Sequence, residues 1–170
     1  YLIGKVDAVS IVVPTVLHHR IAQQFLDQRV HVLLEKPMTV NLEQAAELID
    51  LAARRGMILQ VGHIERFNPA VTVIKPLIKT PRYITTERTA PFTIRCTDVN
   101  VVLDLMIHDL DIVMDLAGSA PKEVSAVGVS IITREIDVAT ARIIFQDGCV
   151  ADVTASRVSD DKKRLLRVFE

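Results

Sequence analysis

HVLLEKPMTVNLEQAAELIDLAARRGMILQVG, residues 31–62, decides the fold of the first part of the chain. The apolar run at 31–37 predicts a strand, the spacing of apolar residues over 42–56 predicts an amphipathic helix, and 58–62 predicts a second strand. Asn41 is a candidate N-cap for the helix, and Gly56 a candidate terminator. A strand, a helix and a strand of these lengths are typical of parallel strands joined by a crossover helix.

The preceding residues continue the same alternation. Residues 7–13, DAVSIVV, predict a strand ending at Pro14, and residues 18–29, HHRIAQQFLDQR, have helical spacing. Ligands of such parallel sheets bind beyond the carboxyl ends of the strands. Those ends carry Pro14-Thr15, Glu35-Lys36-Pro37 and Gly62-His63, which makes Lys36 and His63 candidate site residues.

A glycine-rich phosphate-binding turn is absent from the sequence. A dinucleotide-binding domain normally opens with a strand, the motif G-x-G-x-x-G and a helix N-terminus that holds the pyrophosphate. All six glycines of this chain are isolated. We therefore expect residues 1–65 to be a partial dinucleotide-binding (Rossmann) domain without its Gly-rich first βαβ unit.

From Arg66 onward the pattern changes. A helix is expected to begin near Pro69 and to break at Pro76. Strand-like runs follow at 81–89, 122–133, 137–146, 149–158 and 164–170, and a helix at 101–117 separates the first of them from the rest. This order predicts, for residues 66–170, an α+β domain with an open, mainly antiparallel sheet. One face of that sheet is expected to be polar or used in assembly, and to carry Thr86, Arg88, Thr140, Arg142, Thr154 and Ser156.

VVLDLMIHDLDIVMDL, residues 101–116, places four polar groups in an otherwise apolar helix. At about 100° per residue, His108, Asp111 and Asp115 lie within roughly 40° of Asp104 and form one stripe. Unpaired buried charge costs several kcal/mol, so the stripe requires a cleft, a cation or a hydrogen-bond network. A structural alternative is that two or three of these groups cap backbone or pair with arginine.

Composition excludes several classes of function. The 170 residues are 49% hydrophobic and 24% charged, with a net charge of −1 and no dense basic tract. Neither nucleic acid nor an anionic membrane surface is therefore an expected partner, and no apolar run reaches the length of a membrane span. Cys96 and Cys149 form neither a metal-ligand spacing nor a disulfide framework, which favours a reducing, cytoplasmic setting.

Four segments carry a resemblance to a known family: DAVSIVVPTVLHHRIA, HVLLEKPMT, VGHIERFNPAV and LDLMIHDLD. In this order and at these separations they resemble the glucose–fructose oxidoreductase / inositol dehydrogenase (Gfo/Idh/MocA) family over essentially the whole chain. The resemblance implies an NAD- or NADP-dependent oxidoreductase acting on sugars, cyclitols or sugar nucleotides. It also implies a homodimer or homotetramer formed through the open sheet.

The same resemblance assigns Lys36, Asp104 and His108 to catalysis. Oxidising a secondary alcohol needs a base for the hydroxyl proton and an acceptor for the hydride. Imidazole titrates near the working pH, so His108 is a natural base. Some family members give that role to the lysine, and Lys36 could instead stabilise the developing alkoxide. Asp104 would hold the substrate and influence His108 or Lys36 electrostatically.

Further residues are assigned to the cofactor and the substrate. The nicotinamide half of the cofactor is expected to meet Pro14, Thr15, His18, Glu35 and Lys36. His18 could equally form a helix-start pair with its neighbour His19. His63 and Arg66 are expected to line the substrate pocket, although a core or hinge role for His63 is an equal alternative.

Other readings of the same residues stay open. A zinc site is a rival, because Asp104 and His108 have a chelating i, i+4 spacing, but only His63 and Asp111 are evident further ligands and no metal is expected. A second rival is a family member that binds a sugar nucleotide without turnover. The segments around His63 and His108 resemble those of bacterial family members that oxidise UDP-N-acetylglucosamine at C3, and this resemblance implies that substrate in preference to an inositol or a simple aldose.

Overall fold

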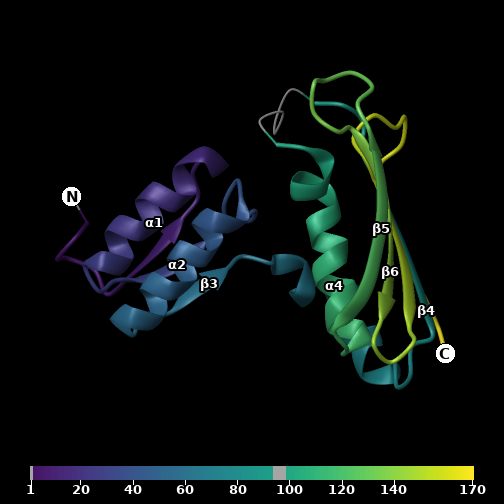
Figure 1. Ribbon diagram of the computed structural model, residues 1–170, viewed down its shortest axis with the longest axis horizontal. Helices are drawn as coiled ribbons and strands as arrows, with labels where there is room; N and C mark the ends of the chain where they lie inside the picture. Colours follow the sequence, from purple (N-terminus) through teal and green to yellow (C-terminus); the bar gives the residue numbers. More distant parts are fainter. Residues whose placement is uncertain (1, 94–98) are drawn as a thin grey trace. The chain divides into compact units, whose positions relative to one another are not determined.

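Two packed units make up the chain, Tyr1–His63 and Ile64–Glu170. The computed structural model describes residues 2–93 and 99–170 (Figure 1). Cys96, one of the two cysteines, lies outside the described residues. Among the helices that are described, none is long and apolar enough to cross a membrane.

The first unit is built on a parallel sheet with the strand order β1-β2-β3. Its strands are β1 (Ala8–Ile11), β2 (His31–Leu34) and β3 (Leu59–Val61). Its helices are η1 (Thr15–Leu17), α1 (His18–Asp27) and α2 (Leu42–Arg55). The predicted alternation of strands and helices, and the parallel pairing, are confirmed.

Helix α2 begins and ends where the sequence predicts. The side chain of Asn41 accepts a hydrogen bond from the backbone N–H of Gln44, and Gly56 ends the helix with a φ of 66°. α1 and α2 lie side by side (Figure 1) and bury one stripe each. Leu26 of α1 and Leu48 of α2 are fully buried with Leu34 of the sheet, and they form the core of this unit.

The second unit contains a five-stranded sheet with the order β5-β6-β7-β4-β8. Its strands are β4 (Tyr83–Thr89), β5 (Pro121–Val129), β6 (Val138–Phe145), β7 (Val150–Ser156) and β8 (Lys163–Phe169). β4 runs parallel to β7, and the other pairs are antiparallel. The expected open and mainly antiparallel sheet is confirmed.

Helices cover one face of this sheet. They are η2 (Ile64–Phe67), α3 (Pro69–Ile74), η3 (Lys75–Leu77), η4 (Val102–Met106) and α4 (Ile107–Ala117). α4 runs along the sheet in Figure 1, and its buried Val113 packs in one cluster with Ile84 and Val153. The helix expected at Pro69 is present, and its α-helical part ends just before Pro76.

The predicted polar face of the sheet is partly wrong. Thr86 and Arg88 are buried on the side that faces the helices, whereas Thr140 and Arg142 are exposed on the opposite side. The parallel register of β4 with β7 sets Thr86 beside Val153, and this places it in the covered face. Alternation along one strand shows which residues share a face, but the register with the next strand decides which face is covered.

The predicted uniform α-helix over residues 101–117 is also wrong in its first turn. Val102–Met106 form a π-helical turn, and the α-helix begins at Ile107. In a π-turn the hydrogen bonds run from residue i to i+5, so the angles expected between Asp104 and the later polar residues do not apply. The helix ends at Gly118, as expected.

Candidate functional site

The carboxyl end of β2 carries Glu35 and Lys36. The backbone N–H of Glu35 makes the last bond of the ladder, to the carbonyl of Ile11 at 3.1 Å, and both residues are half-buried. The Glu35 carboxylate lies over Gly62 at the end of β3, where an added Cβ would come within 3.2 Å of Oε1. A side chain at position 62 would therefore press on this carboxylate.

The carboxyl end of β1 carries Pro14, Thr15 and His18. Pro14 is exposed and Thr15 is half-buried, so both remain open to a ligand. The ring of His18 is only 1% exposed; its Nδ1 lies 2.8 Å from the carbonyl oxygen of Pro37 and its Nε2 lies 2.9 Å from that of Val13. His18 is the first residue of α1, so the structure places it at the helix start with its ring inside the unit.

His63 closes the first unit. It is half-buried, and its Nδ1 atom is buried without a hydrogen-bond partner among the residues that the structure describes. A buried polar atom of this kind needs an explanation, and contact with a ligand is one of several. The substrate role of His63 remains a prediction.

Asp104 and His108 stand on successive turns in the second unit, Asp104 in the π-turn and His108 in α4. The side-chain oxygen of Asn100 accepts hydrogen bonds from the N–H groups of Val102 and Leu103, both at 3.1 Å, so it starts the helical segment. Both candidate residues are half-buried. π-turns inside helices are frequent at functional sites.

The rest of the polar stripe has ion-pair partners. Arg66 donates two hydrogen bonds of 2.7 Å to Asp111, and Lys75 donates one of 2.6 Å to Asp115. The hydrogen bond to Asp111 raises the pKa of Arg66. The structural alternative holds for these two aspartates, because they tie η2 and η3 to α4. Substrate contact by Arg66 remains a prediction. In the structure, the guanidinium of Arg66 donates its hydrogen bonds to Asp111.

A buried charge cluster beside this helix was not predicted. Arg88, 5% exposed, donates to both carboxylate oxygens of Asp109 at 2.9 and 2.8 Å, and lies 3.5 Å from Glu65. Glu65 also accepts a hydrogen bond of 3.1 Å from Arg164. Partial burial raises the pKa of Glu65, but the charges of Arg88, Arg164 and His108 outweigh this effect, and the pKa is lowered. The neighbouring positive charges thus favour the ionised form of Glu65.

One signal in the sequence could have revealed this cluster. Asp109 is the only acidic residue of the helix that stands off the polar stripe, and a carboxylate among apolar positions requires a cation. The cluster borders a cavity of about 330 Å³ that is otherwise lined largely by aliphatic side chains. The second unit therefore offers both charge and hollow space next to Asp109, the residue that follows His108.

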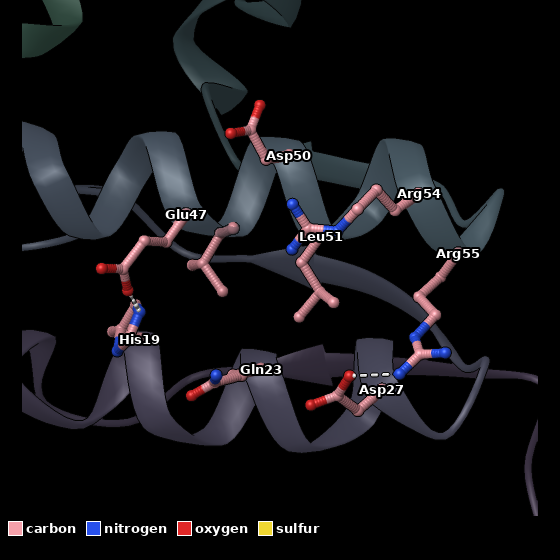
Figure 2. A pocket seen from close by; sticks show the side chains of 9 residues that line it. His19, Gln23, Asp27, Glu47, Asp50, Leu51, Arg54 and Arg55 are labelled. Carbon is pink, nitrogen blue, oxygen red and sulfur yellow. Dashed lines mark hydrogen bonds and ion pairs between the residues drawn. The ribbon is translucent and has the colours of Figure 1, made fainter.

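A groove of about 480 Å³ lies between α1 and α2 (Figure 2). Two ion pairs span it: His19 with Glu47 at 2.8 Å and Arg55 with Asp27 at 3.0 Å. None of the predicted site residues lines this groove. These two ion pairs join α1 to α2.

Within residues 2–93 and 99–170, no group of three or more His, Cys, Asp or Glu side chains is placed to hold a metal ion. A zinc site needs three or four such ligands.

Known proteins resemble this chain along nearly its whole length. UDP-N-acetylglucosamine 3-dehydrogenase from Acidithiobacillus ferrooxidans is 44% identical over 169 residues, which are 99% of this chain and 54% of that protein. Its solved structure superposes with a TM-score of 0.92 and covers 99% of this chain and 56% of the other. scyllo-Inositol 2-dehydrogenase (NAD⁺) from Bacillus subtilis is 31% identical over 91% of this chain and 49% of that protein. The chain thus spans about half the length of these relatives.

Two family descriptions divide the sequence much as the structure does. The oxidoreductase family with an NAD-binding Rossmann fold matches residues 1–63, and the GFO/IDH/MocA C-terminal domain matches residues 82–169. These matches agree with the parallel sheet of the first unit and the open sheet of the second. The chain therefore belongs to the GFO/IDH/MocA oxidoreductase family.

Proposed function

We propose that the full-length protein is an NAD(P)-dependent oxidoreductase that transfers hydride between a secondary alcohol of a sugar or sugar nucleotide and the nicotinamide. The observation that carries this proposal is the 44% identity with UDP-N-acetylglucosamine 3-dehydrogenase over 99% of this chain. Lys36, Asp104 and His108 all lie within that span. We further propose UDP-N-acetylglucosamine, oxidised at C3, as the substrate.

The residues at the strand ends fit the nicotinamide half of the cofactor. A ribose presents hydroxyl groups, and the Glu35 carboxylate and the Thr15 hydroxyl are suitable partners for them, both half-buried beside the strand ends. Gly62 leaves the Glu35 carboxylate the room it occupies. When bound, the nicotinamide supplies the hydride acceptor for the reaction.

The chain's own residues would handle the proton. Oxidation breaks the carbinol C–H bond as the hydride leaves, and the hydroxyl proton passes to a base. We propose that His108 or Lys36 takes this proton, that the other hydrogen-bonds the same oxygen, and that Asp104 orients the sugar. Glu65, held by Arg88 and Arg164, adds a fixed negative charge near His108.

Replacement of the two candidate bases tests this function in the full-length protein. In Lys36→Ala and in His108→Ala we expect kcat/KM, followed as NAD(P)H absorbance with UDP-N-acetylglucosamine, to fall by roughly 10²- to 10⁴-fold. Lys5→Ala, which changes an exposed lysine of the same unit, is the matched control and should retain wild-type activity.

Each other outcome has a distinct meaning. Unchanged turnover in both variants would contradict the assigned site. A wild-type protein that binds the sugar nucleotide without oxidising it would support the non-catalytic alternative. Turnover of scyllo- or myo-inositol in place of the UDP-sugar would retain the reaction and change the substrate class, in line with the inositol dehydrogenases among the relatives.

We also propose that the uncovered face of the five-stranded sheet joins copies of the protein into a homodimer or homotetramer. Two ion pairs lie on this face: Arg142 donates two hydrogen bonds to Asp152, and Lys163 donates one to Glu87. Such pairing lets a second copy cover these four groups without burying an unpaired charge among them.

A further inference from the structure

We infer that His18 is a positioning residue for Lys36, an inference that rests on the catalytic role proposed above for that lysine. The ring of His18 stands between the segments that follow β1 and β2. Its two nitrogens lie 2.9 Å from the carbonyl oxygen of Val13 and 2.8 Å from that of Pro37. One side chain thus reaches both segments that carry the strand-end candidates.

The chemistry of the ring suits this connection. A carbonyl oxygen only accepts hydrogen bonds, so a neutral imidazole donates to one of the two and an imidazolium donates to both. In either form the ring is 1% exposed, which leaves its nitrogens directed at the backbone. His18 belongs to α1, and Ala22 and Leu26 of this helix are buried in the core. The packing of the helix therefore holds the backbone of His18 in place.

Lys36 lies between two backbone anchors. On its N-terminal side, the N–H of Glu35 is bonded to the carbonyl of Ile11 as the sheet ends. On its C-terminal side, the carbonyl of buried Pro37 is held by His18. Without the ring, the anchor on the C-terminal side of Lys36 is lost. A displacement of about 1 Å at a reacting group can lower the rate roughly 100-fold.

This role differs from the cofactor contact that the sequence alone suggested for His18. A cofactor contact predicts weaker binding of NAD(P)H when the ring is removed. A positioning role predicts that cofactor binding is kept while kcat falls and the segment around Lys36 becomes mobile. A role confined to packing predicts a lower melting temperature and neither of the other changes.

The test uses His18→Phe, which keeps a ring of similar size and removes both hydrogen bonds, in the full-length protein. His19→Phe is the matched control, because it removes the neighbouring imidazole and a contact with Glu47 on the other helix. In His18→Phe we expect amide hydrogen exchange of residues 35–40 to become about tenfold faster. We expect kcat to fall roughly 10- to 100-fold with the Kd of NAD(P)H within about twofold of wild type. The control should show none of these changes.

His18→Gln keeps one amide donor and should recover part of both effects, so it carries the test if His18→Phe does not fold. Unchanged exchange and kcat in the His18 variants, or a loss confined to cofactor affinity, would overturn the inference. A wild-type protein that oxidises no sugar would contradict the proposed function instead, and the exchange rates would still decide whether His18 holds the Lys36 segment.

Discussion

A buried side chain of this protein can remain charged when several hydrogen-bond partners surround it in fixed positions. Asp137 is fully buried, and its carboxylate accepts hydrogen bonds from the N–H groups of Ile131, Ile132 and Thr133 at 2.7–2.8 Å and from Nε of Arg157 at 2.8 Å. Burial raises the pKa of Asp137, but the backbone N–H groups and Arg157 outweigh it and hold the pKa far below its usual range. The ionised carboxylate therefore organises the connection between β5 and β6.

Removal of this charge should destabilise the fold. In Asp137→Asn, the buried ion pair with Arg157 is broken and three backbone N–H groups lose their charged acceptor, so we expect the free energy of unfolding at pH 7 to fall by about 3–5 kcal/mol. Chemical denaturation followed by circular dichroism measures the difference. Asp160→Asn, at an exposed position, should stay within about 0.5 kcal/mol of wild type.

The free energy of unfolding should also depend on pH through the ionisation of Asp137. Because the folded-state pKa of Asp137 is depressed, its contribution is complete above the unfolded value of about 3.9 and is lost as the pH falls below that value. The wild-type free energy of unfolding should therefore decrease more steeply below about pH 4 than that of Asp137→Asn. Equal slopes for the two proteins would contradict the assignment.

At the scale of elements, the sequence predicts the features that depend on neighbouring residues. It misses the features that depend on partners distant in the chain. Asn41 and Gly56 mark the ends of α2 because a cap acts within one helical turn. The π-turn around Asp104 leaves no such mark in the sequence. The polar stripe was predicted with a rotation of about 100° per residue, which already assumes an α-helix and therefore cannot reveal a π-turn.

The same division applies to the site. Lys36 could be placed at a strand end because parallel strands present their carboxyl ends together. The contacts of His18 could not be predicted, since one of its acceptors is a backbone carbonyl 19 residues away. The burial of Arg88 could not be predicted either, because it depends on Asp109 in another element.

The start of the helical segment offers a prediction at this scale. Asn100→Ala removes the side-chain acceptor for the N–H groups of Val102 and Leu103 and should lower the free energy of unfolding by about 1 kcal/mol. The turn that carries Asp104 would then fray, so kcat/KM should fall by about tenfold. Asn41→Ala, which removes the cap of α2, should cost similar stability and leave kcat/KM unchanged. Equal activity in the two variants would show that the start of the helix does not position Asp104.

For the whole molecule, the second unit has one sheet face covered by helices and one face without cover (Figure 1). On the uncovered face, Tyr83 donates a hydrogen bond of 2.6 Å to Asp152, which also accepts two from Arg142. The hydrogen bond from Arg142 lowers the pKa of Asp152. The face thus combines internally neutralised charge with exposed apolar side chains such as Val127, a composition that suits contact with a second copy.

Two valines of β5 make this assembly testable. Val127 is 71% exposed and pairs in register with Thr140 of the uncovered face, whereas Val124 is 61% exposed and pairs with Ile143 of the covered face. Because a charge buried without a partner costs several kcal/mol, Val127→Asp should dissociate the full-length oligomer. Val124→Asp adds the same charge to the same strand on the opposite face and should leave the oligomer intact. Light scattering coupled to size-exclusion chromatography gives the mass of each variant. A monomeric wild-type protein, or dissociation by Val124→Asp alone, would show that copies do not meet through this face.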